Sequence, residues 1–276
     1  MIKLPNNFMG KPIKGSLERV LAQAEKGIQP DPDMGKGGAG QPMAQLPAQF
    51  IPQNYVFVGT NPRNSLPVYI AKEIILKGSN WNDTHYSLAA SGLFMPTPWI
   101  MTNHFLNVKH AAEGKGTLYD GGGSPVSSQE VSDLWDYLSL ADSNYRNSKG
   151  VCWTWLDAYF KVEPQTGTWF METNHRVVSN GTQKEIQCDR VQLGAHYQQS
   201  GLVKLNFSTD GLATDASPHN QYTRGENMYY WRPENDKVAG FYANSVRADL
   251  GCDGDPAVVD DSLGVFACAE GTASQK

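Results

Sequence analysis

Charge is scarce in this chain. Only 18% of its 276 residues are charged, and the formal net charge is −5, whereas average domains are about 25% charged. A mildly acidic chain does not attract phosphate backbones, so we expect no nucleic-acid partner. No apolar run approaches the roughly 18 residues that a membrane span requires, so we also expect no membrane insertion.

The signatures of common enzymes and metal centres are missing as well. The six histidines form no ligand pair at metal spacing, the four cysteines form no CxxC pair, and the chain contains neither a Walker A motif nor a GxSxG elbow. Residues 35–40 match GxGxxG, but they lack the flanking strand and helix that a dinucleotide site needs. We therefore expect no catalytic residue, no metal and no cofactor.

Two features near the C-terminus leave alternatives open. Cys252 and Cys268 either form a disulfide that closes a loop-rich segment or, with the other two cysteines, are buried free thiols. An acidic cluster either holds Ca²⁺ or forms a solvated loop, and its spacing does not follow the EF-hand pattern. The cluster consists of Asp249, Asp253, Asp255, Asp260 and Asp261.

Composition changes near residue 50. Residues 16–27 carry apolar side chains at helical spacing and predict a short helix. Residues 28–50 are rich in Pro, Gly and Gln and have no period, which is typical of a linker or arm. We therefore divide the chain into an arm, residues 1–50, and a main domain, residues 51–276. The first residues contain no apolar core of signal-peptide length, so the sequence leaves the localisation unassigned.

In the main domain, the expected helices come before most of the expected strands. The patterns predict strands at 55–58, 68–76 and 152–162, and helices at 83–92, from Thr97 and from the capping box 127–130. The strand at 152–162 is apolar enough to be buried on both faces. Beyond it, only short strand-like pieces between turns are visible. Helices first and strands later, without βαβ alternation, favour the α+β class.

The C-terminal segment uses a restricted alphabet. Residues 238–268 contain no Trp, Met, Lys, Glu or Gln, although these five types make up about one fifth of the chain and about six of them would be expected there. The five missing types are those that a codon ending in a pyrimidine cannot encode. The restriction therefore indicates a mutational process that keeps a pyrimidine at the third codon position.

This alphabet and its frame resemble the variable proteins of diversity-generating retroelements, most closely their archaeal branch. In that family a reverse transcriptase copies a template repeat and randomises its adenines, so that AAY codons become NNY. The frame closes on the segments 261–265 and 268–271, and matches at 93–98 and 153–157 extend the resemblance over about residues 55–271. The frame residues before these closing segments are Asn227, Tyr229, Trp231, Pro233, Ala239, Phe241, Ala243, Ser245, Arg247, Ala248, Leu250 and Pro256.

The resemblance implies a fold and a function. The fold would be the C-type lectin fold of the formylglycine-generating-enzyme-like branch, with helices packed on a small antiparallel sheet and a loop-rich C-terminal half. The function would be that of a ligand-binding protein rather than an enzyme. Its variable region, about residues 227–268, would recognise varied macromolecular targets, and we expect the target to be a protein.

Strand alternation separates the positions that would vary from those that would hold the backbone. Successive residues of a strand point to opposite faces, and the set with Gly240 and Tyr242 alternates with the apolar set of Ala239 and Phe241. Tyr, Asn, Ser, Gly and Asp are also the residues that paratopes use. The predicted ligand-binding positions are Tyr230, Arg232, Gly240, Tyr242, Asn244, Val246, Asp249, Gly251, Asp253, Val258, Val259, Asp260 and Phe266. The predicted scaffold of the site is Trp231, Phe241, Arg247, Leu250, Asp261, Ser262, Leu263 and Gly264, with Arg247 and Asp261 expected to form a buried pair.

Two other functions are compatible with the sequence. A virion structural or adhesion protein would use residues 1–50 as a docking arm and would be displayed on a virion or cell surface. A formylglycine-generating-like oxidase would use Cys252 and Cys268 as its cysteine pair, and copper binding would support it.

Overall fold

The computed structural model describes residues 7–8, 11–12, 50–139, 150–180, 183–194, 196 and 198–271. The chain divides into two compact units, Met1–Gln45 and Leu46–Lys276. In the first unit, β1 (Asn7–Phe8) pairs antiparallel with β2 (Lys11–Pro12). The predicted helix at 16–27, the GxGxxG match at 35–40 and the arm up to residue 49 lie outside the described residues.

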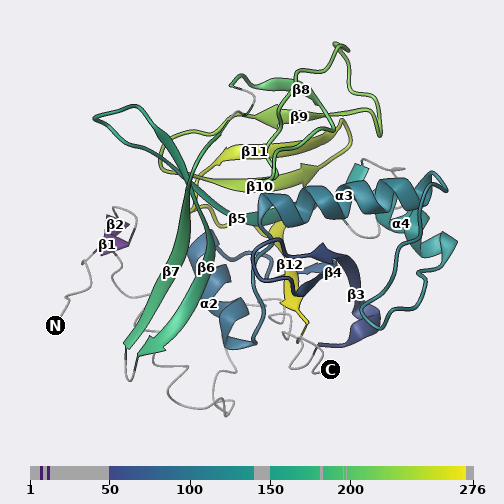
Figure 1. The fold of residues 1–276 in the computed structure, drawn as a ribbon, viewed down its shortest axis with the longest axis horizontal. Coiled ribbons are helices and arrows are strands. Elements are labelled where there is room, and N and C mark those ends of the chain that lie inside the picture. Colours follow the sequence, from purple (N-terminus) through teal and green to yellow (C-terminus); the bar gives the residue numbers. More distant parts are fainter. Residues whose placement is uncertain are drawn as a thin grey trace, which may run out of the picture. The chain divides into compact units, whose positions relative to one another are not determined.

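A ten-stranded mixed sheet dominates the second unit (Figure 1). Eight strands follow one another in the order β3-β4-β12-β5-β10-β11-β9-β8, and β6 and β7 branch off at β5. The pairs β9–β11 and β5–β12 are parallel, and the others are antiparallel. The strands are β3 (Tyr55–Thr60), β4 (Pro67–Ile75), β5 (Cys152–Val162), β6 (Trp169–Asn180), β7 (Gln183–Gln192), β8 (Gly201–Lys204), β9 (Asn227–Trp231), β10 (Lys237–Ala243), β11 (Ala248–Gly254) and β12 (Leu263–Glu270).

The expected fold class is wrong. The sequence predicts an α+β C-type lectin fold with helices packed on a small antiparallel sheet. The structure instead contains twice as much strand as helix, 40% against 20%, and its described residues form one large mixed sheet with three α-helices. Two features account for the difference. The last strand, β12, pairs with both β4 and β5, which joins the early and late strands into one sheet. The segment after residue 162, which was read as short pieces, contains the long β6–β7 hairpin.

Local capping signals place the helices close to where the sequence predicts them. α2 (Trp81–Ala90) begins after Asn80, whose side chain accepts a hydrogen bond from the Asp83 backbone N–H at 2.9 Å. α3 (Pro98–Ala112) begins after Thr97, with Pro98 at its first position as expected. α4 (Ser128–Ser139) begins after Ser127, and a 3₁₀ turn, η1 (Pro52–Asn54), precedes β3.

α3 packs on one face of the sheet and α4 packs beside α3 (Figure 1). The ring of Phe105 on α3 lies 5.9 Å from that of Phe241 on β10 and 5.2 Å from that of Trp135 on α4. α2 covers part of the opposite face, where the indole N–H of Trp81 donates to the Leu156 carbonyl of β5 at 2.8 Å. The prediction that 152–162 forms a strand buried on both faces is therefore confirmed. None of the described helices has the length and apolar character needed to cross a membrane.

Candidate functional site

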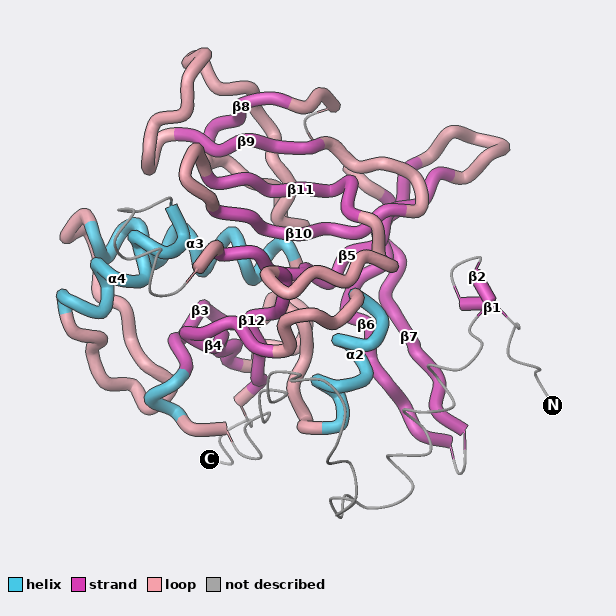
Figure 2. The backbone as a smooth tube through the Cα atoms, turned by 180° about the vertical axis from the view of Figure 1, so that it is seen from behind, coloured by secondary structure: helices cyan, strands magenta, loops and turns pink. Residues whose placement is uncertain are grey.

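The strands β5, β10, β11 and β9 present a face that points away from α3. In Figure 2 the strands β8, β9, β11 and β10 lie side by side, with no described helix in front of them. Cross-strand pairing places two rows of side chains on this face. One row is Trp153, Tyr242, Asp249 and Tyr229, and the other is Trp155, Gly240, Gly251 and Trp231. The Trp155 side chain is buried. The other seven residues of the two rows are called the outer face below.

The Tyr242 ring lies flat over two glycines. A Cβ atom at Gly240 would lie 2.3 Å from the Tyr242 hydroxyl oxygen, and one at Gly251 would lie 2.8 Å from a ring carbon of Tyr242. The ring of Trp153 meets Tyr242 edge-on, with 6.2 Å between centroids. The two glycines thus form a flat floor for one aromatic ring, and this half of the outer face is smooth and largely uncharged. Burial raises the pKa of the Tyr242 hydroxyl above its ordinary value, so this group is neutral and remains a hydrogen-bond donor.

The other half of the outer face is charged and aromatic. The guanidinium of Arg247 lies 3.8 Å from the centroid of the Tyr229 ring and donates from Nε to the Asp249 carboxylate at 2.7 Å. The rings of Tyr229 and Trp231 pack in a tilted arrangement, with 4.9 Å between centroids and 53° between planes. Burial raises the pKa of Asp249 above its ordinary value, although the hydrogen bond and charge of Arg247 oppose this shift. The result is an aromatic and cationic cluster with a single carboxylate at its centre.

The structure brings many of the predicted ligand-binding positions to one side of the molecule. Gly240, Tyr242, Asp249 and Gly251 belong to the outer face. Tyr242 is partly exposed, Asp249 is 6% exposed, and the two glycines are buried beneath the Tyr242 ring. The β10–β11 turn carries Asn244, which accepts hydrogen bonds from the backbone of residues 246 and 247, and Val246, which is 68% exposed. Partly or fully exposed positions in the flanking loops and strand ends are Arg232, Asp253, Val258, Val259 and Asp260.

Two predicted ligand-binding positions are wrong. Tyr230 and Phe266 are buried, at 0% and 1% exposure. Leu250 and Tyr230 are cross-strand partners on the core side of the sheet, and Phe266 packs edge-on against Tyr137. Trp231 is the converse case, because it was expected in the core and is 36% exposed on the outer face. The error comes from strand parity: a shift of one residue exchanges the two faces of β9.

The predicted scaffold is largely in the core. Phe241 and Leu250 are buried cross-strand partners, and Leu263 and Gly264 are buried on β12. Gly264 has no room for a side chain, because a Cβ atom there would lie 2.5 Å from the Ile75 carbonyl oxygen.

The prediction of a buried Arg247–Asp261 pair is wrong. Arg247 forms an ion pair with Asp249, and Asp261 is exposed in the loop before β12. In that loop, the partly buried Ser262 donates its backbone N–H to the Asp260 carboxylate at 2.7 Å. The prediction failed because the partner of Arg247 is local: Asp249 follows two residues later on the same extended segment, so the two side chains lie on one face.

The acidic loop is held by backbone contacts. The N–H of Gly78 donates to the Asp260 carbonyl at 3.2 Å, and the N–H of Trp81 donates to the Pro256 carbonyl at 3.2 Å. The carboxylates of Asp255 and Asp260 each accept a backbone N–H two residues on. Among the described residues, the groups of ligand atoms close enough to hold a metal ion do not include this cluster. Its side chains therefore shape the loop.

All four cysteines are free thiols. Cys152, Cys252 and Cys268 are buried, whereas Cys188 is exposed, contrary to the alternative in which all four are buried. Cys252 on β11 and Cys268 on β12 lie on strands separated by β5 and β10. At about 4.8 Å per strand they are roughly 14 Å apart, far beyond the reach of a disulfide. The structure thus offers no close pair of these two thiols.

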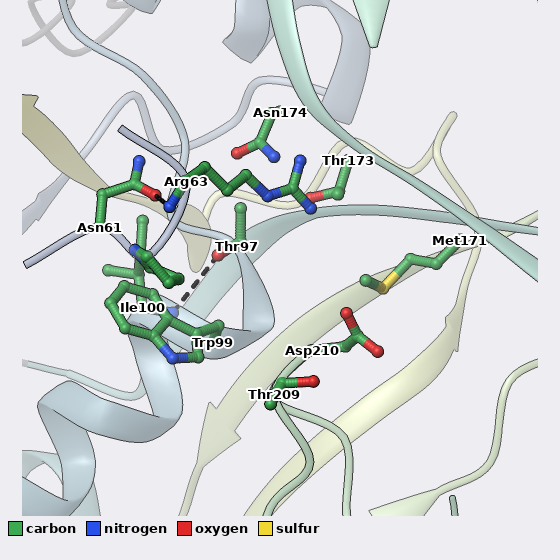
Figure 3. A pocket seen from close by; sticks show the side chains of 11 residues that line it. Asn61, Arg63, Thr97, Trp99, Ile100, Met171, Thr173, Asn174, Thr209 and Asp210 are labelled. Carbon is green, nitrogen blue, oxygen red and sulfur yellow. Dashed lines mark hydrogen bonds between the residues drawn. The ribbon is translucent and has the colours of Figure 1, made fainter. Parts of the chain in front are cut away.

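A small pocket lies elsewhere, at the start of α3 (Figure 3). The β3–β4 loop contributes Asn61 and Arg63, β6 contributes Thr173, and a turn contributes Asp210. The Arg63 guanidinium is paired with the Asp189 carboxylate and is therefore not a free cation. The predicted ligand-binding positions do not line this pocket, so it is separate from the outer face. Comparison of the chain with protein-family models, curated proteins and solved structures gives no significant match.

Proposed function

We propose that this chain is a ligand-binding protein that recognises a protein target through the outer face and the loops around it, and that a retroelement diversifies this surface. One observation carries the proposal. Gly240, Tyr242, Asp249 and Gly251, which the codon-restricted alphabet marks as variable, lie next to one another on the side of the sheet away from α3.

The chemistry of the outer face suits protein recognition. It combines rigid aromatic side chains, an arginine–carboxylate pair and exposed apolar residues in the adjacent loops. Tyr, Trp and Arg are enriched among the residues that dominate the energetics of protein interfaces, and Tyr and Trp bury a large area at low entropic cost. A standard interface needs roughly 800 Å² on each partner. Four strands and the loops at 244–247 and 255–262 are of the right size to supply this area.

The architecture also tolerates variation. The outer-face residues lie on central strands whose backbones are paired on both sides, so their position does not depend on their own side chains. The opposite sides of β10 and β11 carry the buried Phe241 and Leu250. A mutator that changes alternate residues would therefore alter the binding surface and spare the core.

The neighbouring DNA provides the first test. We expect a near-copy of the 3′ end of the reading frame, differing mainly where the copy has adenine, next to a reverse transcriptase gene. In sibling sequences, variation should concentrate at Gly240, Tyr242, Asp249 and Gly251 and spare Phe241. A genome without such a repeat, or variation spread evenly over both faces of β10, would refute the diversification.

Two matched libraries test the binding role directly. One library places NNY codons at Tyr229, Trp231, Tyr242 and Asp249, and the control library places them at four core positions of the same strands, Met228, Tyr230, Phe241 and Leu250. Both are displayed on the full chain and sorted for protease resistance. We expect most outer-face variants, and few core variants, to remain folded, and selection of the folded pool on unrelated protein targets should yield binders. Equal loss of folding in both libraries would contradict the assignment.

A further inference from the structure

The β6–β7 hairpin contains a bulge that places three potential metal ligands together. Thr173 pairs with Asp189 and Arg176 pairs with Gln187, so Asn174 and His175 together face the single residue Cys188. Asn174 has a positive φ of 54°, and its side chain donates to the Asp189 carboxylate at 3.0 Å. Bulges of this kind redirect a side chain and are common beside functional sites.

Three different donor atoms converge at this bulge. A carboxylate oxygen of Glu172, a ring nitrogen of His175 and the sulfur of Cys188 all lie within 4.8 Å of one another. In a tetrahedral zinc site, bonds of about 2.0–2.3 Å place the ligand atoms roughly 3–4 Å apart. Small side-chain movements would therefore close the site. Thiolate, imidazole and carboxylate together are a donor set typical of Zn²⁺.

Asp157 on β5 orients the histidine from behind. Its carboxylate lies 2.5 Å from Nδ1 of His175 and accepts the His175 backbone N–H at 2.9 Å. Nε2 of His175 is buried and has no hydrogen-bond partner among the described residues. A carboxylate on one ring nitrogen and a metal on the other is the common arrangement around protein-bound zinc, because the carboxylate fixes the tautomer. An unpaired buried nitrogen is otherwise costly.

His85 lies on the closed side of the same cluster. Its Nε2 is 3.6 Å from the Asp157 carboxylate, and Trp81 packs edge-on against both histidine rings, at 4.3 and 5.0 Å. His85, Asp157 and His175 also form a group with the spacing of metal ligands, but all three are buried and Nδ1 of His175 already contacts Asp157. The bulge side is open, because Cys188 is exposed. Solvent therefore has access to the donor atoms from this side.

We propose that Glu172, His175 and Cys188 bind one divalent transition-metal ion of the zinc class, with Asp157 as a positioning residue. Binding displaces the thiol proton of Cys188 and the proton on Nε2 of His175, because both ligands coordinate in their deprotonated forms. Both carboxylate oxygens of Glu172 contact Nζ of Lys161, at 2.9 and 3.0 Å. Metal binding therefore moves one oxygen from the lysine to the ion, while the other oxygen keeps its contact with Lys161. The ion ties β6 to β7 and so stabilises the hairpin.

Cobalt titration of the purified full chain tests the proposal. After chelator treatment, we expect one equivalent of Co²⁺ to bind, with visible bands of a tetrahedral ion and the near-ultraviolet charge-transfer absorption of a cobalt–thiolate bond, and Zn²⁺ to displace it. Cys188→Ser should abolish the charge-transfer absorption and lower the affinity at least tenfold, and Asp157→Asn should lower it about 10–100-fold. The control His219→Gln, at an exposed histidine beside Glu226, should bind as the parent does.

The proposal would be overturned by the absence of stoichiometric Co²⁺ or Zn²⁺ binding, by a cobalt spectrum without thiolate absorption, or by unchanged affinity in Cys188→Ser. Because Cys188 is exposed, this variant should fold, and circular dichroism checks that it does. Rapid alkylation of Cys188 by iodoacetamide that Zn²⁺ does not suppress would instead identify a histidine-activated thiol, and the metal site would be rejected.

Discussion

Replacing Gly240 with alanine is expected to displace the Tyr242 ring from the outer face. The new Cβ atom would lie 2.3 Å from the tyrosine oxygen and 2.6 Å from Cζ, so the two groups cannot occupy their present positions together. The ring then loses its edge contact with Trp153, worth about 0.5–1.5 kcal/mol, and some buried apolar area worth roughly another 1 kcal/mol. We expect a coupling free energy between positions 240 and 242 of about 1.5–2.5 kcal/mol.

A double-mutant cycle measures this coupling. The parent, Gly240→Ala, Tyr242→Ala and the double variant are unfolded in urea, and the intrinsic preference of alanine over glycine in a strand cancels in the cycle. In the Tyr242→Ala background, Gly240→Ala should be neutral or stabilising by roughly 0.5–1 kcal/mol, because the strand loses flexibility and nothing clashes.

Gly201 on β8 provides the matched control. A Cβ atom there has nothing within 4 Å, so a cycle of Gly201→Ala with Tyr242→Ala should show no coupling. A coupling below about 0.5 kcal/mol between positions 240 and 242 is within the additivity of independent sites and would refute the packing of the ring over the glycine. A confirmed coupling would mean that neighbouring diversified positions do not vary independently.

Two further predictions concern stability. His104 is buried, neither ring nitrogen has a hydrogen-bond partner among the described residues, and burial lowers its pKa from 6.5 to about 3. Below pH 6.5 the imidazole of His104 therefore takes up a proton in the unfolded chain but not in the folded chain, so the free energy of unfolding falls as the pH drops. Between pH 7.5 and 5 this group should lower the free energy of unfolding by about 2 kcal/mol. Urea unfolding of His104→Leu should lack this part of the pH dependence, and a parallel profile in both proteins would contradict it. Phe241→Ala should cost about 3–5 kcal/mol in the same assay, whereas Val246→Ala, at a 68% exposed position, should stay within about 0.5 kcal/mol, and similar losses in both would disprove the separation of core and surface.

The hairpin that carries the metal ligands had a signal in the sequence. Asn180–Gly181 is a strong hairpin dipeptide. A two-residue loop at these positions would place His175 opposite Ile186, whereas the observed pairing of Arg176 with Gln187 places it beside Cys188. The contact between Asp157 and His175 had no such signal in the sequence, because Asp157 lies on the neighbouring strand β5 and its position depends on how β5 and β6 align. Ligand pairs at a fixed sequence spacing therefore do not reveal this cluster, because its members lie on three strands and one helix.

The sequence by itself determined what depends on neighbouring residues. The caps at Thr97 and Ser127 placed α3 and α4, the apolar run at 152–162 gave the central strand, and alternation put Phe241 inside and Tyr242 outside. Each of these outcomes depends on a few consecutive residues whose backbone groups and side chains act locally.

Only the tertiary structure decided which strands pair and which faces are covered. The pairing of β12 with β4 and β5 replaced the expected small sheet by a ten-stranded one. The contacts that stabilise this pairing join residues 190–202 positions apart for β4 and 110 positions apart for β5. The face of β9 was equally undetermined: Met-Tyr-Tyr-Trp is apolar throughout, so only pairing with β11 sends Tyr230 into the core and Trp231 to the outer face.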